Sequence, residues 1–399
     1  MGQALRELDP RSSAAAAFGA ELRDRRVAAR RSLAELGRAV LVSGDLLGKI
    51  EKAQRRPHED LVRRLDDALE ARGELLRLAA TFVEIDSAVA LPEVESFTPD
   101  TAEARLRRLI GEVRSADHIM AADRVQEIVG YSKVAERFTT KVPVNQRAPL
   151  LRTVAEAQQL TGWMMFDRGH CANAERMLAS ARASAERAEA LDLVAFVGGP
   201  NAAFMSTWTG TPARGAEQAY GAWAWARRSG NRRLAAFVAT MAARAHARMG
   251  EADLCQRMLS TAETDLARHR AEEFDPDWLA VFDAAALAGH RGSCLLELGK
   301  PRQAIVALQE QERTGPKGFI RNNIIWQLER AAANLRLGEI DDAVAGVDRT
   351  LVYVEQRPVT PRVVNVFRSI ERNLRRTARA DNTLVDLRER LRRFIVESG

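Results

Sequence analysis

Five glycines recur between residues 169 and 338, and their spacing restricts the fold of this 399-residue chain more than any other feature. They are Gly169, Gly210, Gly250, Gly299 and Gly338, which lie 41, 40, 49 and 39 residues apart. Each stands between two stretches in which apolar residues recur three and four positions apart, the period of an amphipathic helix. Because glycine tolerates backbone angles that other residues avoid, it suits the turn of a helical hairpin. The spacing predicts a series of helix pairs.

Small residues keep a constant distance from each of these glycines. Five positions after them stand Ala174, Gly215, Cys255, Ala304 and Ala343, and seven positions before them stand Gly162, Ala203, Ala243, Gly292 and Ala331. Small side chains at these offsets allow the two helices of a hairpin to approach closely. The pattern resembles the tetratricopeptide repeat, with the usual period of about 34 residues lengthened to about 40. An irregular helical bundle is the alternative.

The resemblance implies a superhelix whose concave face carries the first helix of each pair. At the groove-facing offsets, or one offset away for Asn201, stand Glu156, Gln159, Trp163, Asn201, Phe204, Trp208, Arg244 and Arg248. Aromatic rings beside two arginines suit an extended peptide or a small anionic ligand. Packing of these rings within the solenoid is the alternative interpretation.

The first eighty residues predict five short helices. Phe18–Ala29 comes first, with Phe18, Leu22 and Val27 as its apolar stripe. Ser32 and Ser43 then precede two short helical stretches, 33–40 and 44–52, and serine is a favoured N-cap because its hydroxyl accepts a hydrogen bond from a first-turn amide. Two short helices joined by a tight turn outline a helix-turn-helix. Stretches 58–71 and 74–85 predict the last two helices.

The run SLAELGRAVLVSGDLLGKIEKAQRRP, residues 32–57, resembles the XRE class of phage-repressor-like helix-turn-helix domains. The match includes Leu36-Gly37, Val42-Ser43, Ile50-Glu51 and the basic end Arg55-Arg56-Pro57. The resemblance implies that the second helix of the motif enters the major groove of DNA. It also implies that Arg26 pairs with Glu51, because a buried carboxylate requires a partner.

The predicted DNA-binding residues are Ser32, Leu33, Ser43, Gly44, Asp45, Lys49, Lys52, Arg55 and Arg56. Lys49 is positioned to donate to guanine and Asp45 to accept from cytosine. Lys52, Arg55 and Arg56 are placed to contact phosphates, which gives affinity without sequence preference. Leu33 replaces the glutamine of many relatives, and Gly44 and Gly48 weaken the reading helix by roughly 1 kcal/mol each.

The charge distribution agrees with a DNA-binding head. The chain carries a formal charge of +6, and residues 18–56 alone hold ten Arg/Lys against five Asp/Glu. The alternative for this segment is a small helical domain that contacts other proteins.

The predicted fold is all-α: a five-helix lambda-repressor-like domain followed by a tetratricopeptide-like α-solenoid. The predicted order is a disordered arm at 1–15, the DNA-binding domain at 16–82, a linker at 83–101 and the repeat domain at 102–399. Residues 102–150 form the leading helices, and the last 40 residues form a degenerate final pair. The linker holds two prolines and five acidic residues.

The combination resembles bacterial, actinobacterial-type transcriptional regulators. It implies a cytoplasmic homodimer that binds a palindromic operator in double-stranded DNA and responds to a peptide or small-molecule effector. The alternative is an adaptor, in which the repeats hold a protein partner constitutively and the head tethers it to DNA. An antitoxin is disfavoured by the length.

The sequence offers little for catalysis. It contains no GxxxxGK[ST], HExxH or GxSxG motif, and its six histidines are scattered. Its three cysteines lie far apart without metal-ligand spacing. We therefore expect no enzyme activity, no cofactor, no metal and no membrane segment.

Overall fold

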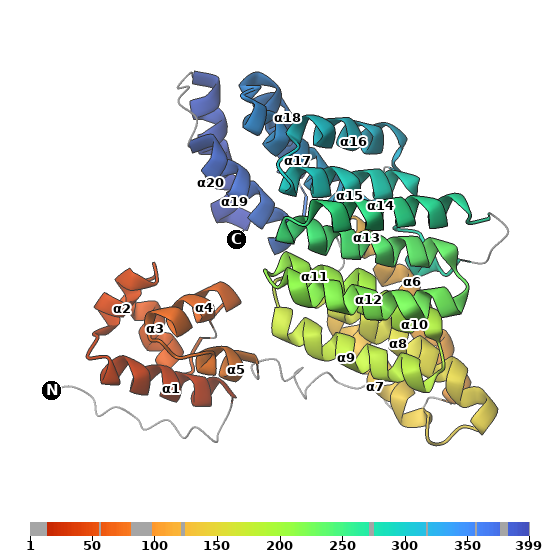
Figure 1. The fold of residues 1–399 in the computed structure, drawn as a ribbon. Coiled ribbons are helices and arrows are strands. Elements are labelled where there is room, and N and C mark those ends of the chain that lie inside the picture. The colour runs from red at the N-terminus through yellow and green to blue at the C-terminus, as the bar shows by residue number, and fades with distance from the viewer. Residues whose placement is uncertain are drawn as a thin grey trace. The chain divides into compact units, whose positions relative to one another are not determined.

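The structure is a computed structural model that describes residues 14–55, 57–80, 98–120, 124–270, 275–316, 318–355, 357–375 and 382–398. Within these ranges the chain is all-helical, and it divides into two compact units, Met1–Ala90 and Leu91–Gly399 (Figure 1). Most of the predicted arm and of the predicted linker lies outside the described residues. None of the described helices is long and apolar enough to cross a membrane.

The first unit contains five helices. They are α1 (Ala14–Ala28), α2 (Leu33–Ala39), α3 (Gly44–Glu51), α4 (Glu59–Ala68) and α5 (Glu74–Ala80). Phe18 and Leu22 of α1 are fully buried against Leu36, Leu47 and other apolar side chains of the remaining helices. Val27 is 59% exposed, so its predicted place in the buried stripe is wrong. It stands nine positions after Phe18, which at 3.6 residues per turn is the opposite face of α1.

The second unit is a succession of helical hairpins. Its leading helices are α6 (Pro99–His118) and α7 (Val125–Phe138), so α6 begins before residue 102. The repeats comprise α8 (Val144–Asp167), α9 (Cys171–Arg187), α10 (Leu191–Phe196), η3 (Val197–Ala203), α11 (Phe204–Trp208), α12 (Pro212–Ser229), α13 (Arg232–Met249), α14 (Ala252–Ala267), η4 (Asp277–Leu279), α15 (Ala284–Glu297), α16 (Pro301–Thr314), α17 (Ile320–Leu337) and α18 (Ile340–Val354). Figure 1 shows these hairpins stacked one on another.

The five spaced glycines turn the chain within these hairpins. Each has a positive φ, between 72° and 96°, which glycine adopts without strain. The ten small residues on either side of them are buried. At Gly292 an added Cβ would lie 2.5 Å from Leu308, so a larger residue would force the hairpin apart. The predicted hairpin architecture is confirmed.

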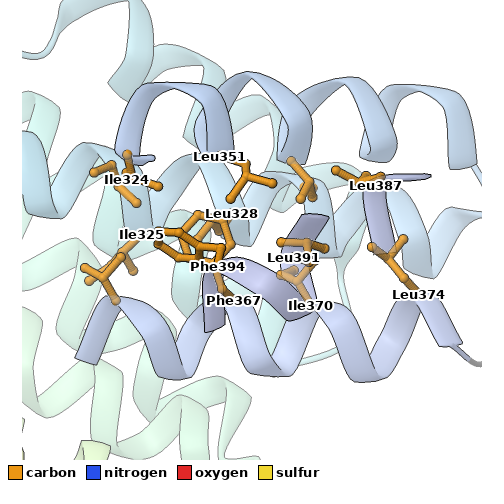
Figure 2. Close-up of a cluster of buried hydrophobic side chains, with 14 of the residues drawn as sticks. Ile324, Ile325, Leu328, Leu351, Phe367, Ile370, Leu374, Leu387, Leu391 and Phe394 are labelled. Atoms are coloured by element: carbon orange, nitrogen blue, oxygen red, sulfur yellow. The ribbon is translucent and has the colours of Figure 1, made fainter. Parts of the chain in front are cut away.

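The last two helices close the second unit. α19 (Pro361–Arg375) and α20 (Asn382–Ser398) pack on α17 and α18 through a buried apolar cluster (Figure 2). Leu328, Leu351, Phe367 and Leu391 contribute one side chain from each of the four helices, and all are fully buried. Because α19 folds back on α17, the residues at its N-terminal end reach the interior of the stack.

A wide helical turn interrupts the second repeat. α10, η3 and α11 form one continuous run, Leu191–Trp208, in which η3 has π-helical hydrogen bonding. Pro200 lies inside η3 and has no amide hydrogen to donate, so the ordinary α ladder is broken there. The amide of Phe204 instead donates to the carbonyl of Gly199, five residues back. Such π turns often occur at functional sites, and this one carries Asn201.

Candidate functional site

Close packing of α2 on α3 builds the helix-turn-helix. A Cβ added at Gly37 would lie 2.6 Å from the carbonyl oxygen of Val42, and one at Gly44 would lie 3.2 Å from the backbone of Leu33 and Ala34. Gly48 faces the side chain of Leu33, which is partly buried against the apolar core of the first unit. In the free protein, Gly44 and Gly48 therefore serve helix–helix packing.

Both serines act as N-caps. The Ser32 hydroxyl accepts from the amide of Glu35, whose carboxylate accepts from the Ser32 amide in return, which makes a reciprocal capping box. The Ser43 hydroxyl accepts from the amide of Leu46. These contacts satisfy first-turn amides and hold the start of α3 in place.

A buried ion pair joins α1 to the end of α3. Glu51 is 3% exposed, and the guanidinium of Arg26 donates to both of its carboxylate oxygens, at 2.5 and 2.9 Å. Arg23 donates to the Glu51 carbonyl at 3.1 Å. The hydrogen bond from Arg26 to Glu51 is the main cause of a raised pKa for Arg26. The pair sets the position of α3 on the scaffold.

The remaining predicted DNA-binding residues of the head are polar and exposed. Asp45 lies in the first turn of α3 and forms an exposed ion pair with Lys49, one turn later, at 2.8 Å. Lys52 and Arg55 are exposed just beyond the helix. Arg56 lies outside the described residues. An exposed pair of this kind contributes little to stability, so both side chains can exchange their contact for another partner.

The eight predicted groove residues fall into three groups. Gln159, Trp163, Asn201 and Phe204 line one cavity of about 90 Å³. Phe204 also borders a neighbouring groove, together with Trp208, Arg244 and Arg248.

Glu156 lines neither space. It lies 3.8 Å from Arg114 and 3.7 Å from Arg152. Its carboxylate therefore balances part of the positive charge of Arg114 and Arg152.

Aromatic rings form much of the cavity wall. Phe196 and Trp278 lie with ring centroids 4.4 Å apart, and Trp163 and Phe204 lie 5.9 Å apart. Phe237 and Met241 of α13 complete the apolar lining with Leu160. The cavity therefore offers flat apolar surfaces on several sides.

Two arginines and two aspartates form a buried ion cluster at the edge of the cavity. Arg321 donates to both carboxylate oxygens of Asp117, at 2.9 and 2.8 Å, and to Asp167 at 3.1 Å. Nε of Arg362 lies 2.7 Å from Oδ1 of Asp167, although the angle departs from hydrogen-bond geometry, so the contact is an ion pair only. All four side chains are less than 10% exposed.

Arg362 also occupies an aromatic cage. Its guanidinium carbon lies 5.0 to 5.6 Å from the ring centroids of Trp163, Phe166, Phe204 and Trp208. Contacts of this kind favour a cation over a ring face. Three of the rings predicted to face a groove therefore contact a side chain from α19, far away in the sequence.

Burial shifts the ionisation of this cluster. Desolvation lowers the pKa of Arg362 to about 10, although Asp167 opposes the shift. Desolvation likewise lowers the pKa of Arg114 and of His290. For Asp117 burial is the largest single effect and raises the carboxyl pKa, but the charge and hydrogen bonds of Arg321, with smaller contributions from His118 and Arg362, together lower it. Arg321 differs from the other two arginines: burial opposes its charge, but Asp117 and Asp167 together raise its pKa.

Several cavity residues escaped the sequence analysis. Arg114, Trp278, His290, Arg321 and Arg362 come from α6, η4, α15, α17 and α19, none of which held a predicted groove position. The unusual run VGGPN at 197–201 was the one available sign of an irregular site. Within the described ranges, no three His, Cys, Asp or Glu side chains gather in a way that suits a metal ion.

The second unit is expected to lose stability in mild acid because of His118. Burial is the main cause that lowers its pKa from 6.5 to about 4. Between these values the unfolded chain binds a proton that the folded chain does not, so the free energy of unfolding falls as the pH drops through this window. We expect a loss of about 2 kcal/mol between pH 7 and pH 5 from this group.

Urea unfolding followed by tryptophan fluorescence at pH 7 and pH 5 tests this expectation. The His118→Asn variant should show a pH dependence about 2 kcal/mol smaller than that of the parent chain. Equal pH dependence in the two proteins would contradict it.

Comparison with known proteins identifies the first unit. A family profile described as a helix-turn-helix domain matches residues 17–79. A search of curated proteins returned no match. Among solved structures, the crystal structure of Bacillus thuringiensis PlcR in complex with the peptide PapR7 and DNA is similar at 11% identity and a TM-score of 0.28. That alignment covers 85% of this chain and 95% of PlcR. The chain thus contains a helix-turn-helix domain.

Proposed function

We propose that this chain is a sequence-specific DNA-binding transcription regulator of the XRE class. The observation that carries the proposal is the helix-turn-helix match over residues 17–79, in which α3 is followed by exposed Lys52 and Arg55. Basic side chains beside a recognition helix are suited to phosphate contacts. Residues 16–82 form the DNA-binding domain, the domain for effector binding and dimerisation begins with α6 at Pro99, and the residues between them form the linker.

The exposed side of α3 that carries Asp45 and Lys49 is the proposed base-reading element. Asp45 and Lys49 are exposed and form an ion pair with each other. On DNA, Lys49 would donate to guanine and Asp45 accept from cytosine. Ser32 and Ser43 are the N-caps of α2 and α3. Together with the neighbouring Leu33 and Gly44, they would set how closely the start of α3 approaches the bases. Arg55 and Arg56 extend the phosphate contacts.

The protein acts as a homodimer on a palindromic operator. One helix-turn-helix covers one half-site, so two heads raise affinity and specify half-site spacing. An effector bound in the repeat domain changes this spacing if it binds two arrangements of the hairpins with different affinity. No catalytic step is required.

Selection of genomic fragments by the full-length protein tests this function, followed by affinity measurements over a range of salt concentrations. Lys52→Ala/Arg55→Ala removes two proposed phosphate contacts. Because both heads of the homodimer carry the change, four phosphate contacts are lost per complex. We therefore expect the slope of log K against log salt to become shallower by about 3.6, and the affinity to fall roughly 4000-fold at 0.1 M salt if the effect vanishes at 1 M.

The matched control is Arg72→Ala/Arg77→Ala. Both side chains are exposed in the same unit but lie outside the motif, and the net charge changes by the same amount. This control should keep the parental slope within error. If the two double variants lose affinity equally, α3 does not lie where we propose. If no fragment is enriched over random DNA, the regulator function is wrong.

A further inference from the structure

We propose that the cavity beside Asn201 binds a small aromatic carboxylate with a single ring or an indole ring. The inference rests on the proposed function only in treating this ligand as the effector. The cavity lies among the first helices of consecutive repeats, with Gln159 on α8, Asn201 on η3, Phe237 on α13 and His290 on α15. α6 and α19 border it through Arg114 and Arg362. A ligand there would contact elements from both ends of the repeat domain.

Buried polar atoms without a partner point to a ligand. Oδ1 of Asn201 and Nε1 of Trp278 line the cavity, each on a side chain that is 3% exposed, and neither has a hydrogen-bond partner among the described residues. Nδ1 of His290, Nη2 of Arg114 and Nε of Arg321 also lack a hydrogen bond among the described residues, although Nη2 of Arg114 lies 3.8 Å from the carboxylate of Glu156. More than nine in ten buried polar groups in proteins have a partner. Their concentration around one cavity indicates a polar molecule or ordered water within it.

The unpartnered atoms indicate which groups the ligand carries. Trp278, Arg114 and Arg321 present N–H donors, and Nη2 of Arg362 adds a fourth. Only Asn201 and His290 offer acceptors, and the Asn201 amide can rotate to offer a donor instead. A ligand that satisfies this set must be rich in acceptors.

The charge of the lining favours an anion. The residues that line the cavity include three arginines, Arg114, Arg321 and Arg362, and one carboxylate, that of Asp117. Asp167 balances Arg321 and Arg362 from behind. Glu156 lies 3.8 Å from Arg114, also outside the lining. Burial is the main cause that lowers the pKa of both Arg114 and Arg362, so an anion among them would stabilise their charged forms. A carboxylate is both anionic and an acceptor on two atoms, so it fits these donors.

The walls and the volume limit the rest of the ligand. Trp163, Phe196, Phe204, Phe237 and Trp278 present ring faces and edges, which stack on flat apolar groups. The volume of about 90 Å³ exceeds the roughly 10–15 Å³ needed by one water molecule. It is below the approximately 150 Å³ of a cavity that holds benzene. A bound ring must therefore displace a lining side chain, and Trp163, which is only half-buried, is the least confined of the tryptophans there.

Calorimetric titration of the full-length protein with benzoate, phenylacetate and indole-3-carboxylate tests the proposal, with benzyl alcohol as the neutral probe. We expect at least one carboxylate to bind with a Kd on the order of 1 mM, as suits so small a molecule. It should bind at least tenfold more tightly than benzyl alcohol, because hydrogen bonds to charged groups are the stronger ones. Failure of all three carboxylates to bind at 10 mM, or equal binding of benzyl alcohol, would overturn the proposal.

Two tryptophan variants locate the site. Trp278→Phe keeps a ring in the wall but removes the unpartnered N–H, and should weaken binding about fivefold or more. Trp223→Phe is the matched control, because Nε1 of Trp223 is also buried without a partner but the residue does not line the cavity. It should bind within twofold of the parent chain. Equal effects of the two changes would place the ligand elsewhere.

A second variant covers the case in which Trp278→Phe does not fold. Asn201→Ala removes Oδ1 of Asn201, the other unpartnered atom named above, which lies on η3. It should also weaken binding of the carboxylate fivefold or more, while parental affinity in a folded Asn201→Ala chain would overturn the site. DNA binding is measured on the same samples. DNA binding without carboxylate binding refutes the cavity proposal alone, and carboxylate binding without DNA binding refutes the regulator function alone.

Discussion

The substitution Asp167→Asn is expected to lower the free energy of unfolding of the second unit by about 3–5 kcal/mol. Asp167 is 1% exposed and faces two guanidinium groups, those of Arg321 and Arg362. The amide has nearly the shape of the carboxylate but lacks its charge. Two buried cations would then share Asp117 as their nearest anion. Removal of one partner from a buried ion pair is costly because the remaining charge stays desolvated.

Tryptophan fluorescence during urea unfolding measures this loss in the full-length chain. All six tryptophans lie at or beyond Trp163, so the emission reports the second unit and not the head. Glu186→Gln is the control, because it breaks an exposed pair with Arg182 and should change the free energy by less than about 1 kcal/mol. If Asp167→Asn changes the free energy of unfolding by less than about 1 kcal/mol, water solvates the charges of the ion cluster, contrary to the packing described.

Arg26→Leu is expected to destabilise the head by about 2–4 kcal/mol. Glu51 would remain buried, with the guanidinium of Arg23 3.7 Å from its carboxylate as the nearest cation. Since the pair joins α1 to α3, the loss should appear as faster hydrogen exchange in both helices and as weaker DNA binding. The double variant Arg26→Leu/Glu51→Leu should recover much of the stability, because an apolar pair carries no buried charge.

Arg25→Leu is the matched control for this change. Arg25 adjoins Arg26 on α1, but its partner Glu21 lies one turn away on the same helix and both side chains are about one-third exposed. We expect less than about 0.5 kcal/mol from it. If Arg25→Leu and Arg26→Leu accelerate exchange in α3 equally, the Arg26–Glu51 pair has no special role in positioning that helix.

The sequence was most informative about local structure. Ser32 and Ser43 indicated helix starts, and the five glycines marked the hairpin turns because their backbone angles are a property of the residue itself. The small residues at fixed offsets marked the tight helix contacts, since only a missing side chain permits them. Val27 was misplaced because it does not follow the period of Phe18 and Leu22: nine positions after Phe18, it falls on the opposite face of α1.

The composition of the cavity could not be predicted in the same way. Trp163 and Phe204 were found because they recur within the repeat, but the arginine in their cage comes from α19, about 200 residues after Trp163. Periodicity relates neighbouring repeats and says nothing about which distant side chain enters between them. The same reason hid Trp278 and His290, which belong to an irregular connection and to a later repeat.

The sequence by itself determined that this chain is helical, that a helix-turn-helix precedes stacked hairpins, and where those hairpins turn. These features depend on residues close together in the chain, and the amino-acid sequence gives both their spacing and their backbone preferences. Only the tertiary structure decided that α6, α17 and α19 bring charged groups to the aromatic face of the repeats. It also decided that Oδ1 of Asn201 and Nε1 of Trp278 lie beside a cavity with no hydrogen-bond partner among the described residues. Burial and the pairing of charges are properties of the assembled stack, because they depend on which distant residues exclude water from one another.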